Sequence, residues 1–225
     1  MLRIAAMRKK FFYVIAAVFA ALLVALIPVV SAPSAYAAAA PSGTTTEKYV
    51  QESIDRGYLI LRDTKITEPL RQEKFREFAL SIMDAQRIGL FTLGRFANGA
   101  SKADIDAFVA AFADFTAAVY ETRLMKYKDH TLAVTGSQAR AEDDVVVNCT
   151  ATDPKNPDKP PFKVAFRIRK TADGKLTVTD MNIEGIWQTL THRADFTSFL
   201  QQRGGRISDL VNDLKRQTQT LYASG

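Results

Sequence analysis

Apolar residues recur every three or four positions between Glu47 and Val119, a period typical of helices that bury one face. The breaks in this pattern predict four successive helices: 47–62, 67–83, 84–93 and one that begins at Ser101. The last helix is the clearest, because Ser101 and Asp104 have the spacing of a capping box and the apolar stripe that follows is rich in phenylalanine. Its polar positions, Glu121 among them, are expected to face solvent.

After His130 the apolar period changes to two, which predicts strands. The alternation is cleanest over 162–169, and Asp173-Gly174 predicts a tight hairpin turn into a further strand over 176–184. The apolar phase shifts within that last strand, which indicates a β-bulge near Thr179 or Asp180.

Helical spacing returns over 188–202 and 207–221, with Gly204-Gly205 between the two segments. The order of helices, then an antiparallel meander of about four strands, then helices predicts an α+β domain rather than a βαβ fold. We expect the helices to cover one face of the sheet.

The N-terminus has the organisation of a signal peptide. A basic segment at 1–10 precedes an apolar run at 11–30, and Ala35-Tyr36-Ala37 fits a cleavage site. We therefore expect a signal peptide at 1–37, cleaved after Ala37, and a single mature domain at 38–225. The apolar run is longer than usual, so an uncleaved membrane anchor stays open as an alternative. Both alternatives place the folded part outside the cytoplasm.

The charge of the chain argues against nucleic-acid binding, and its cysteine content excludes an internal disulfide. The formal net charge is +6, but four of the positive charges, Arg3, Arg8, Lys9 and Lys10, lie in the leader. Without them the mature chain carries only +2, which is too little for a nucleic-acid-binding surface. The single cysteine, Cys149, cannot form an internal disulfide.

Two segments carry a resemblance to a known family. The sequence VTDMNIEGIW at 178–187, continued by THRADFTSFL at 191–200, resembles the C-terminal signature of the MlaC/Ttg2D family. The sequence IGLFTLGR at 88–95, followed by the phenylalanine-rich helix, resembles the middle region of that family. The resemblance covers nearly all of the mature chain and is strongest to the branch associated with hopanoid loci.

The resemblance implies a curved antiparallel sheet with helices packed around an apolar cavity that takes acyl chains. It implies a monomeric periplasmic carrier, without cofactor, of a phospholipid or a hopanoid-type lipid. As partners it implies an inner-membrane MCE-type ABC transport complex and an outer-membrane lipoprotein complex.

Two sets of apolar residues are candidates for lining such a cavity, one from the phenylalanine-rich helix and one from the strands. They are Phe108, Phe112, Phe115 and Val119, and Val147, Val164, Phe166 and Ile168. An ordinary packed core fits the same residues, because apolar stripes usually face a core. If they line a cavity, replacing Phe112 with Asp is expected to weaken lipid retention, since an unpaired carboxylate in an apolar slot is costly.

Arginines are the candidates for contact with a head group or a partner, because a guanidinium binds phosphate through two hydrogen bonds. Arg95 and Arg193 are the main candidates, and Arg167 is an additional one. For each of them, the alternative is a solvated position on the surface. Asp180 and Glu184 are expected to make structural polar contacts.

Two other function classes remain open. An enzyme would have to use Asp114 or Asp129 near His130, because no metal-ligand spacing, nucleophile elbow or nucleotide-binding motif is present and we expect Cys149 to be buried. We therefore expect neither catalytic nor metal-binding residues. A periplasmic adaptor of a transporter would show a close-packed interior, whereas a carrier needs room for a lipid.

Overall fold

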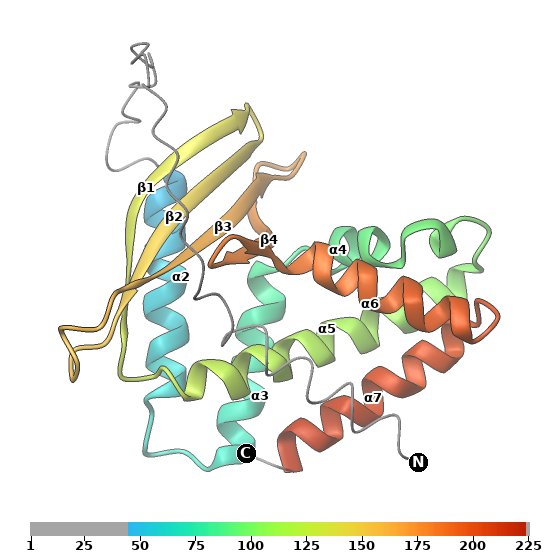
Figure 1. Ribbon diagram of the computed structural model, residues 1–225, viewed down its shortest axis with the longest axis horizontal. Coiled ribbons are helices and arrows are strands. Elements are labelled where there is room, and N and C mark those ends of the chain that lie inside the picture. The colour runs from blue at the N-terminus through green and yellow to red at the C-terminus, as the bar shows by residue number, and fades with distance from the viewer. Residues whose placement is uncertain (1–44, 224–225) are drawn as a thin grey trace, which may run out of the picture. The chain divides into compact units, whose positions relative to one another are not determined.

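The computed structural model describes residues 45–223, so the expected signal peptide at 1–37 lies outside the described part (Figure 1). In chain order the elements are α2 (Thr45–Leu61), α3 (Glu68–Ile82), α4 (Ala85–Leu93), the 3-10 helix η1 (Gly94–Ala97), α5 (Lys102–Met125), β1 (Thr131–Ala141), β2 (Asp144–Thr152), β3 (Phe162–Lys170), β4 (Leu176–Ile183), β5 (Ile186–Trp187), α6 (Gln188–Gln202) and α7 (Ile207–Ala223). The order confirms the α+β class. Between residues 45 and 223, every helix is too short or too polar to cross a bilayer.

The helix starts follow the local sequence signals. At the start of α5, the Ser101 hydroxyl accepts a hydrogen bond from the Asp104 N–H at 3.1 Å and donates one to the Asp104 carboxylate at 2.7 Å. The aspartate side chain therefore bonds the serine hydroxyl rather than the serine backbone. Asp84 caps α4 by accepting from the Arg87 N–H at 3.0 Å, whereas Thr67 precedes α3 without a side-chain cap.

Helix α5 is the centre of the helical part, with α3, α4 and α7 packed around it (Figure 1). Phe108, Ala113 and Ala118 are all buried although they point to different sides of the helix. The expectation that Glu121 faces solvent is wrong. Glu121 is 3% exposed, and its carboxylate accepts a hydrogen bond from Arg71 of α3 at 3.3 Å, because α3 covers that side of α5. Burial raises the pKa of Glu121, and the Arg71 hydrogen bond opposes that rise.

The strands form one antiparallel sheet in the order β1-β2-β3-β4-β5. Four long strands were expected, and β5 adds a fifth that pairs with the end of β4. This strand has two residues, too few to produce an alternating pattern in the sequence. The turn before it holds Glu184 and Gly185, both with positive φ, and the Glu184 carboxylate accepts a hydrogen bond from the Lys163 N–H of β3.

A bulge in β4 confirms the expected irregularity. Arg167 lies opposite Asp180 and Ile168 lies opposite Val178, so Thr179 has no residue opposite it. The extra residue explains why Val178 and Met181, three positions apart, both pack in the cluster on the apolar face of the sheet.

The helical part joins the sheet along β4. Met83, just after α3, makes an isolated parallel bridge with Val178. The Asp180 carboxylate accepts hydrogen bonds from the backbone N–H and the hydroxyl of Thr189, at 3.1 and 2.6 Å, in the first turn of α6. Asp180 therefore has the structural role expected of it, with a threonine rather than an arginine as its closest partner.

Candidate functional site

The apolar face of the sheet is covered mainly by α2. Val50 and Ile54 of α2 pack against buried residues of the two central strands. Three of these, Val147, Val164 and Ile168, are candidate cavity residues, and they are 0%, 7% and 1% exposed. The fourth strand candidate, Phe166, lies on the same face but is only partly buried. The structure thus brings the four strand candidates together.

Polar contacts hold α2 against β1. The Gln51 side chain accepts a hydrogen bond from the Val134 N–H at 3.0 Å, and the Ser137 hydroxyl donates to the Glu47 carboxylate at 2.6 Å. At the other end of α2, the Arg62 guanidinium donates to backbone carbonyls just before β1. Helix α2 therefore lies over β1 and β2, toward one side of the sheet.

Much of the apolar sheet face remains partly accessible. Ten hydrophobic side chains pack against this cluster without being buried: Tyr49, Tyr58, Leu132, Val134, Val145, Phe162, Phe166, Leu176, Val178 and Met181. A contiguous set of this kind is typical of a surface that binds an apolar partner or ligand. Neither tyrosine was among the predicted cavity residues, although both stand in the apolar stripe of the first predicted helix.

The candidates on α5 lie in a different cluster. Phe108, Phe112 and Phe115 are 0%, 1% and 8% exposed and pack with residues of α4, α6 and α7, and Val119 lies at the edge of the same cluster. The Phe108 and Phe112 rings meet the ring of Phe196 edge-on at centroid distances of 6.0 and 6.1 Å. The structure therefore does not join the helix candidates and the strand candidates into one set.

His192 belongs to this aromatic cluster. Its ring stacks on Phe196 at 5.5 Å and meets Phe112 and Phe115 edge-on. Burial, together with the nearby Arg123 charge, lowers the pKa of His192 to about 4. The imidazole is neutral at pH 7 and serves as part of the core.

The opposite face of the sheet is polar. Arg167 donates two hydrogen bonds to the Asp144 carboxylate, at 2.9 and 2.5 Å, and Arg169 donates a third at 2.9 Å. The Arg167 hydrogen bonds hold the pKa of Asp144 below its usual range. Arg167, considered as a head-group ligand, is therefore already occupied by a carboxylate that is 3% exposed.

The other two candidate arginines lie on the helical part. Arg95 in η1 and Arg193 on α6 are exposed, and each guanidinium lies over a phenylalanine ring, at 5.1 and 4.9 Å from the centroids of Phe96 and Phe91. A Cβ atom at Gly94 would lie 3.2 Å from the Arg193 Nε, so Arg193 packs closely on the junction of α4 and η1.

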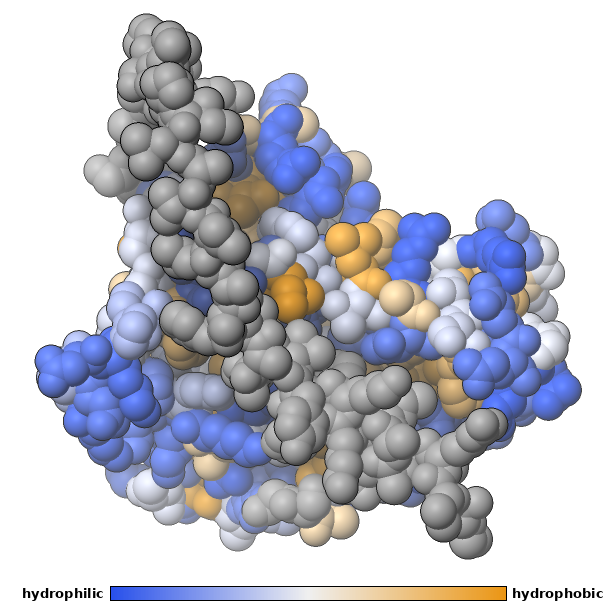
Figure 2. All heavy atoms as spheres, in the orientation of Figure 1, coloured by the Kyte–Doolittle hydropathy of each residue, from blue (hydrophilic) through white to orange (hydrophobic). Residues whose placement is uncertain are grey.

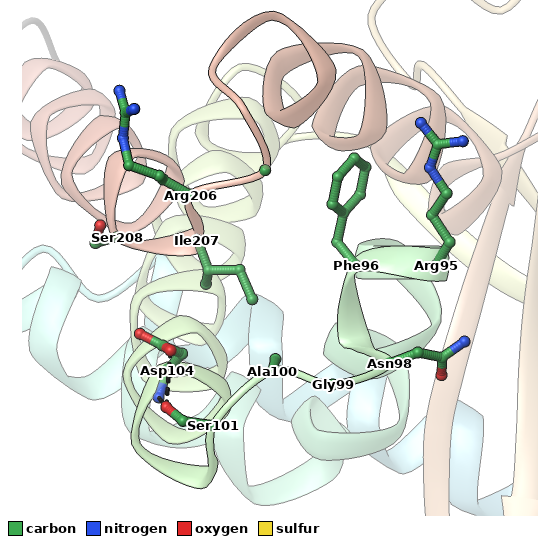
Figure 3. A pocket seen from close by; sticks show the side chains of 11 residues that line it. Arg95, Phe96, Asn98, Gly99, Ala100, Ser101, Asp104, Arg206, Ile207 and Ser208 are labelled. Carbon is green, nitrogen blue, oxygen red and sulfur yellow. Dashed lines mark hydrogen bonds between the residues drawn. The ribbon is translucent and has the colours of Figure 1, made fainter.

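Two pockets are lined by residues other than the ten partly accessible hydrophobic ones. One, of about 730 Å³, opens between η1, the start of α5 and the α6–α7 turn, with Arg95, Phe96 and Ile207 among its lining residues (Figure 3). The other, of about 410 Å³, lies over β2, β3 and β4 beside Asn148 and Ala165. Among the candidate residues, Arg95 borders the first pocket and Val164 borders the second.

The residues considered for catalysis are engaged elsewhere. Asp114 pairs with Arg76, and Asp129 pairs with Lys155 at 2.6 Å. Burial raises the pKa of the Cys149 thiol to about 12, so the thiol is not a nucleophile at neutral pH. Over residues 45–223, histidine, cysteine, aspartate and glutamate do not gather in groups that could hold a metal ion.

Comparison with known proteins bears on both family and fold. The family model described as MlaC protein matches residues 51–216, a range that begins in α2, ends in α7 and includes all five strands. Among solved structures, the chain resembles the phospholipid-binding protein from Ralstonia solanacearum in complex with a phospholipid. The TM-score is 0.64 at 23% sequence identity, covering 78% of this chain and 97% of that chain. At this identity the likeness shows a shared fold.

Proposed function

The chain belongs to the MlaC family, and on that premise we propose that it is a periplasmic carrier that binds a phospholipid with the acyl chains against the apolar sheet face. The observation that carries the proposal is the incomplete cover of that face, where eight hydrophobic side chains of the strands remain partly accessible, together with two tyrosines of α2. Each methylene that leaves water on such a face contributes about 0.8 kcal/mol, so acyl chains are bound mainly by apolar contact.

The proposal places the ligand beside Val147, Val164, Phe166 and Ile168, within reach of α2. It treats Phe108, Phe112, Phe115 and Val119 as packing of the adjoining helical part. Arg95 and Arg193 lie on that helical part, and the proposal gives them no contact with the head group of the carried lipid.

Family membership and the lipid in the related structure support the carrier function. MlaC proteins are periplasmic, which agrees with the signal-peptide pattern at 1–37. Transfer between an inner-membrane MCE-type ABC complex and an outer-membrane lipoprotein complex is the proposed physiological role, and a hopanoid-type lipid is the alternative cargo. Neither catalysis nor a cofactor enters the proposal.

Native mass spectrometry of the protein isolated from periplasm, with extraction of the bound lipid, tests the proposal. We expect a stoichiometric phospholipid. Phe166→Asp should abolish lipid binding, because it would place an unpaired carboxylate on the apolar face of the sheet. Ala165→Asp is the matched control, since the neighbouring residue points to the opposite face. A lipid-free protein after incubation with vesicles, or equal loss in both variants, would rule the site out.

A further inference from the structure

Three arginines on the helical part share one arrangement. Each guanidinium lies over a phenylalanine ring, with the pairs and centroid distances Arg95–Phe96 at 5.1 Å, Arg193–Phe91 at 4.9 Å and Arg203–Phe199 at 4.8 Å. All three arginines are exposed, and within residues 45–223 none has a carboxylate at ion-pair distance. Arg71, Arg76 and Arg167 differ, because each of them pairs with an aspartate or glutamate.

The first two pairs lie on elements that pack together. Helix α4 and η1 both contact α6, and Arg193 rests on the Gly94 backbone between them. In the close view, Arg95 and Phe96 project from η1 to the same side (Figure 3). We name this region the α4–α6 surface and define it by Phe91, Arg95, Leu190 and Arg193. Arg203 is not part of it, because Phe199 under its guanidinium lies about 120° around α6 from Arg193.

The α4–α6 surface also exposes large apolar side chains. Phe91 is 39% exposed and Leu190 is 56% exposed. Leu190 lies three residues before Arg193, about 60° away around the helix, so the two side chains stand on the same side of α6. Figure 2 shows hydrophobic side chains at the surface where α4 and the first turns of α6 lie.

Nearby carboxylates leave the positive charge of this surface uncompensated. Asp84, at the start of α4, is bound by Arg87 at 3.1 Å. Asp195 follows Arg193 by two residues, about 200° around the helix, and therefore points to the other side of α6. The α4–α6 surface thus combines cationic groups with exposed apolar groups, and its positive charge is complementary to an anionic partner.

We propose that the α4–α6 surface docks on the anionic head-group layer of a phospholipid bilayer. The guanidiniums bind lipid phosphates, and Phe91 and Leu190 enter the boundary between head groups and acyl chains. A bilayer fits better than an acidic protein, because side chains that stand out from helices enter a fluid interface without a matched groove. This proposal rests on the proposed function, because membrane docking is useful to a protein that carries lipid: it brings the carrier to the membrane that holds the lipid.

Co-flotation of the full chain with vesicles tests the docking. We expect binding to phosphatidylcholine vesicles that contain about 30% phosphatidylglycerol and little binding to pure phosphatidylcholine. Binding should fall steeply between about 0.02 M and about 0.5 M NaCl. Arg95→Glu and Arg193→Glu should each weaken vesicle binding about tenfold, because each reverses a charge at the membrane surface. Leu190→Asp should also weaken it, and since Leu190 is more than half exposed, that variant should fold.

Arg140→Glu is the matched control, because Arg140 is an exposed arginine on β1, outside the α4–α6 surface. Equal loss of vesicle binding in this variant would show a net-charge effect and overturn the proposal. Failure of the wild type to bind anionic vesicles at low salt would also overturn it and leave an acidic protein as the occupant. Native mass spectrometry of the same samples separates the two proposals. A protein that contains bound lipid but does not bind vesicles would refute the docking proposal. A lipid-free protein that binds vesicles would refute the proposed carrier function.

Discussion

The helical cluster around α5 and the sheet cluster under α2 differ in how completely they are closed. In the helical cluster twelve buried hydrophobic residues are accompanied by nine partly buried ones. In the sheet cluster the proportion is reversed, with six buried and ten partly buried. The helical cluster has the pattern of a packed core. The sheet cluster has the pattern of an apolar surface that is only partly covered and can bind an apolar ligand.

Geometry explains the difference. Helix α5 has neighbours on several sides, so its side chains meet other side chains in every direction. Four long strands span about 15 Å from backbone to backbone, whereas a helix with its side chains is about 10 Å wide. A single helix placed over β1 and β2 therefore leaves the faces of β3 and β4 less covered. The two clusters therefore differ less in their buried residues than in how many partly accessible hydrophobic side chains surround them.

The largest expected effect comes from opening the helical cluster. Phe112→Ala should lower the free energy of unfolding by about 3–5 kcal/mol, because it removes a ring that is 1% exposed and leaves a cavity among packed rings. Urea denaturation measures the loss. The lipid bound per folded molecule should stay unchanged. A stable variant that has lost its lipid would instead place the ligand in the helical cluster.

A pH titration of stability sharpens the contrast at His192. The pKa of this group is about 4 in the folded protein and 6.5 in the unfolded chain, so protonation favours unfolding. The stabilisation is fully present above pH 6.5 and is lost as the pH falls to about 4, a change of about 3 kcal/mol.

Urea denaturation of the wild type and of His192→Phe at pH 7 and pH 4.5 measures this contribution. The variant should lose less stability on acidification, while carboxyl groups with raised pKa, such as Glu121, affect both proteins equally. The same pH dependence in both proteins would show that His192 is hydrated rather than part of the core.

The smallest effect on stability is expected on the sheet. Phe166→Ala should lower the free energy of unfolding by only about 1–2 kcal/mol, because this ring is already partly exposed. Its effect on lipid occupancy should exceed that of Phe112→Ala. Comparing both variants by urea denaturation and native mass spectrometry decides the point, and a loss of stability as large as that of Phe112→Ala would show that Phe166 is a core residue.

Local signals predicted much of the fold. The helix expected over 188–202 was found at Gln188–Gln202, and the bulge at Thr179 followed from a phase shift in the apolar pattern. Strand β5 was not predicted, because two residues are too few to show an alternating apolar pattern. Glu121 was misplaced because its position on a helix wheel does not show that α3 brings Arg71 to it.

The candidate site was only partly predictable. The strand residues Val147, Val164, Phe166 and Ile168 share a face by simple alternation, and the structure brings them together. Nothing in the sequence distinguishes them from Phe108 and Phe112, which are as apolar and as regularly spaced. Likewise, the sequence named Arg95 and Arg193 but not the phenylalanine rings under them, because such pairs form between elements or depend on side-chain direction.

By itself, the sequence determined the long helices and strands of this protein and their order, because helix and strand periods and capping signals act within a few residues of chain. Only the tertiary structure decided which apolar face is closed and which stays open, that Glu121 is buried, and which arginines lack a carboxylate partner. Burial and charge pairing depend on neighbours distant in the chain, and no local pattern states which neighbours those are.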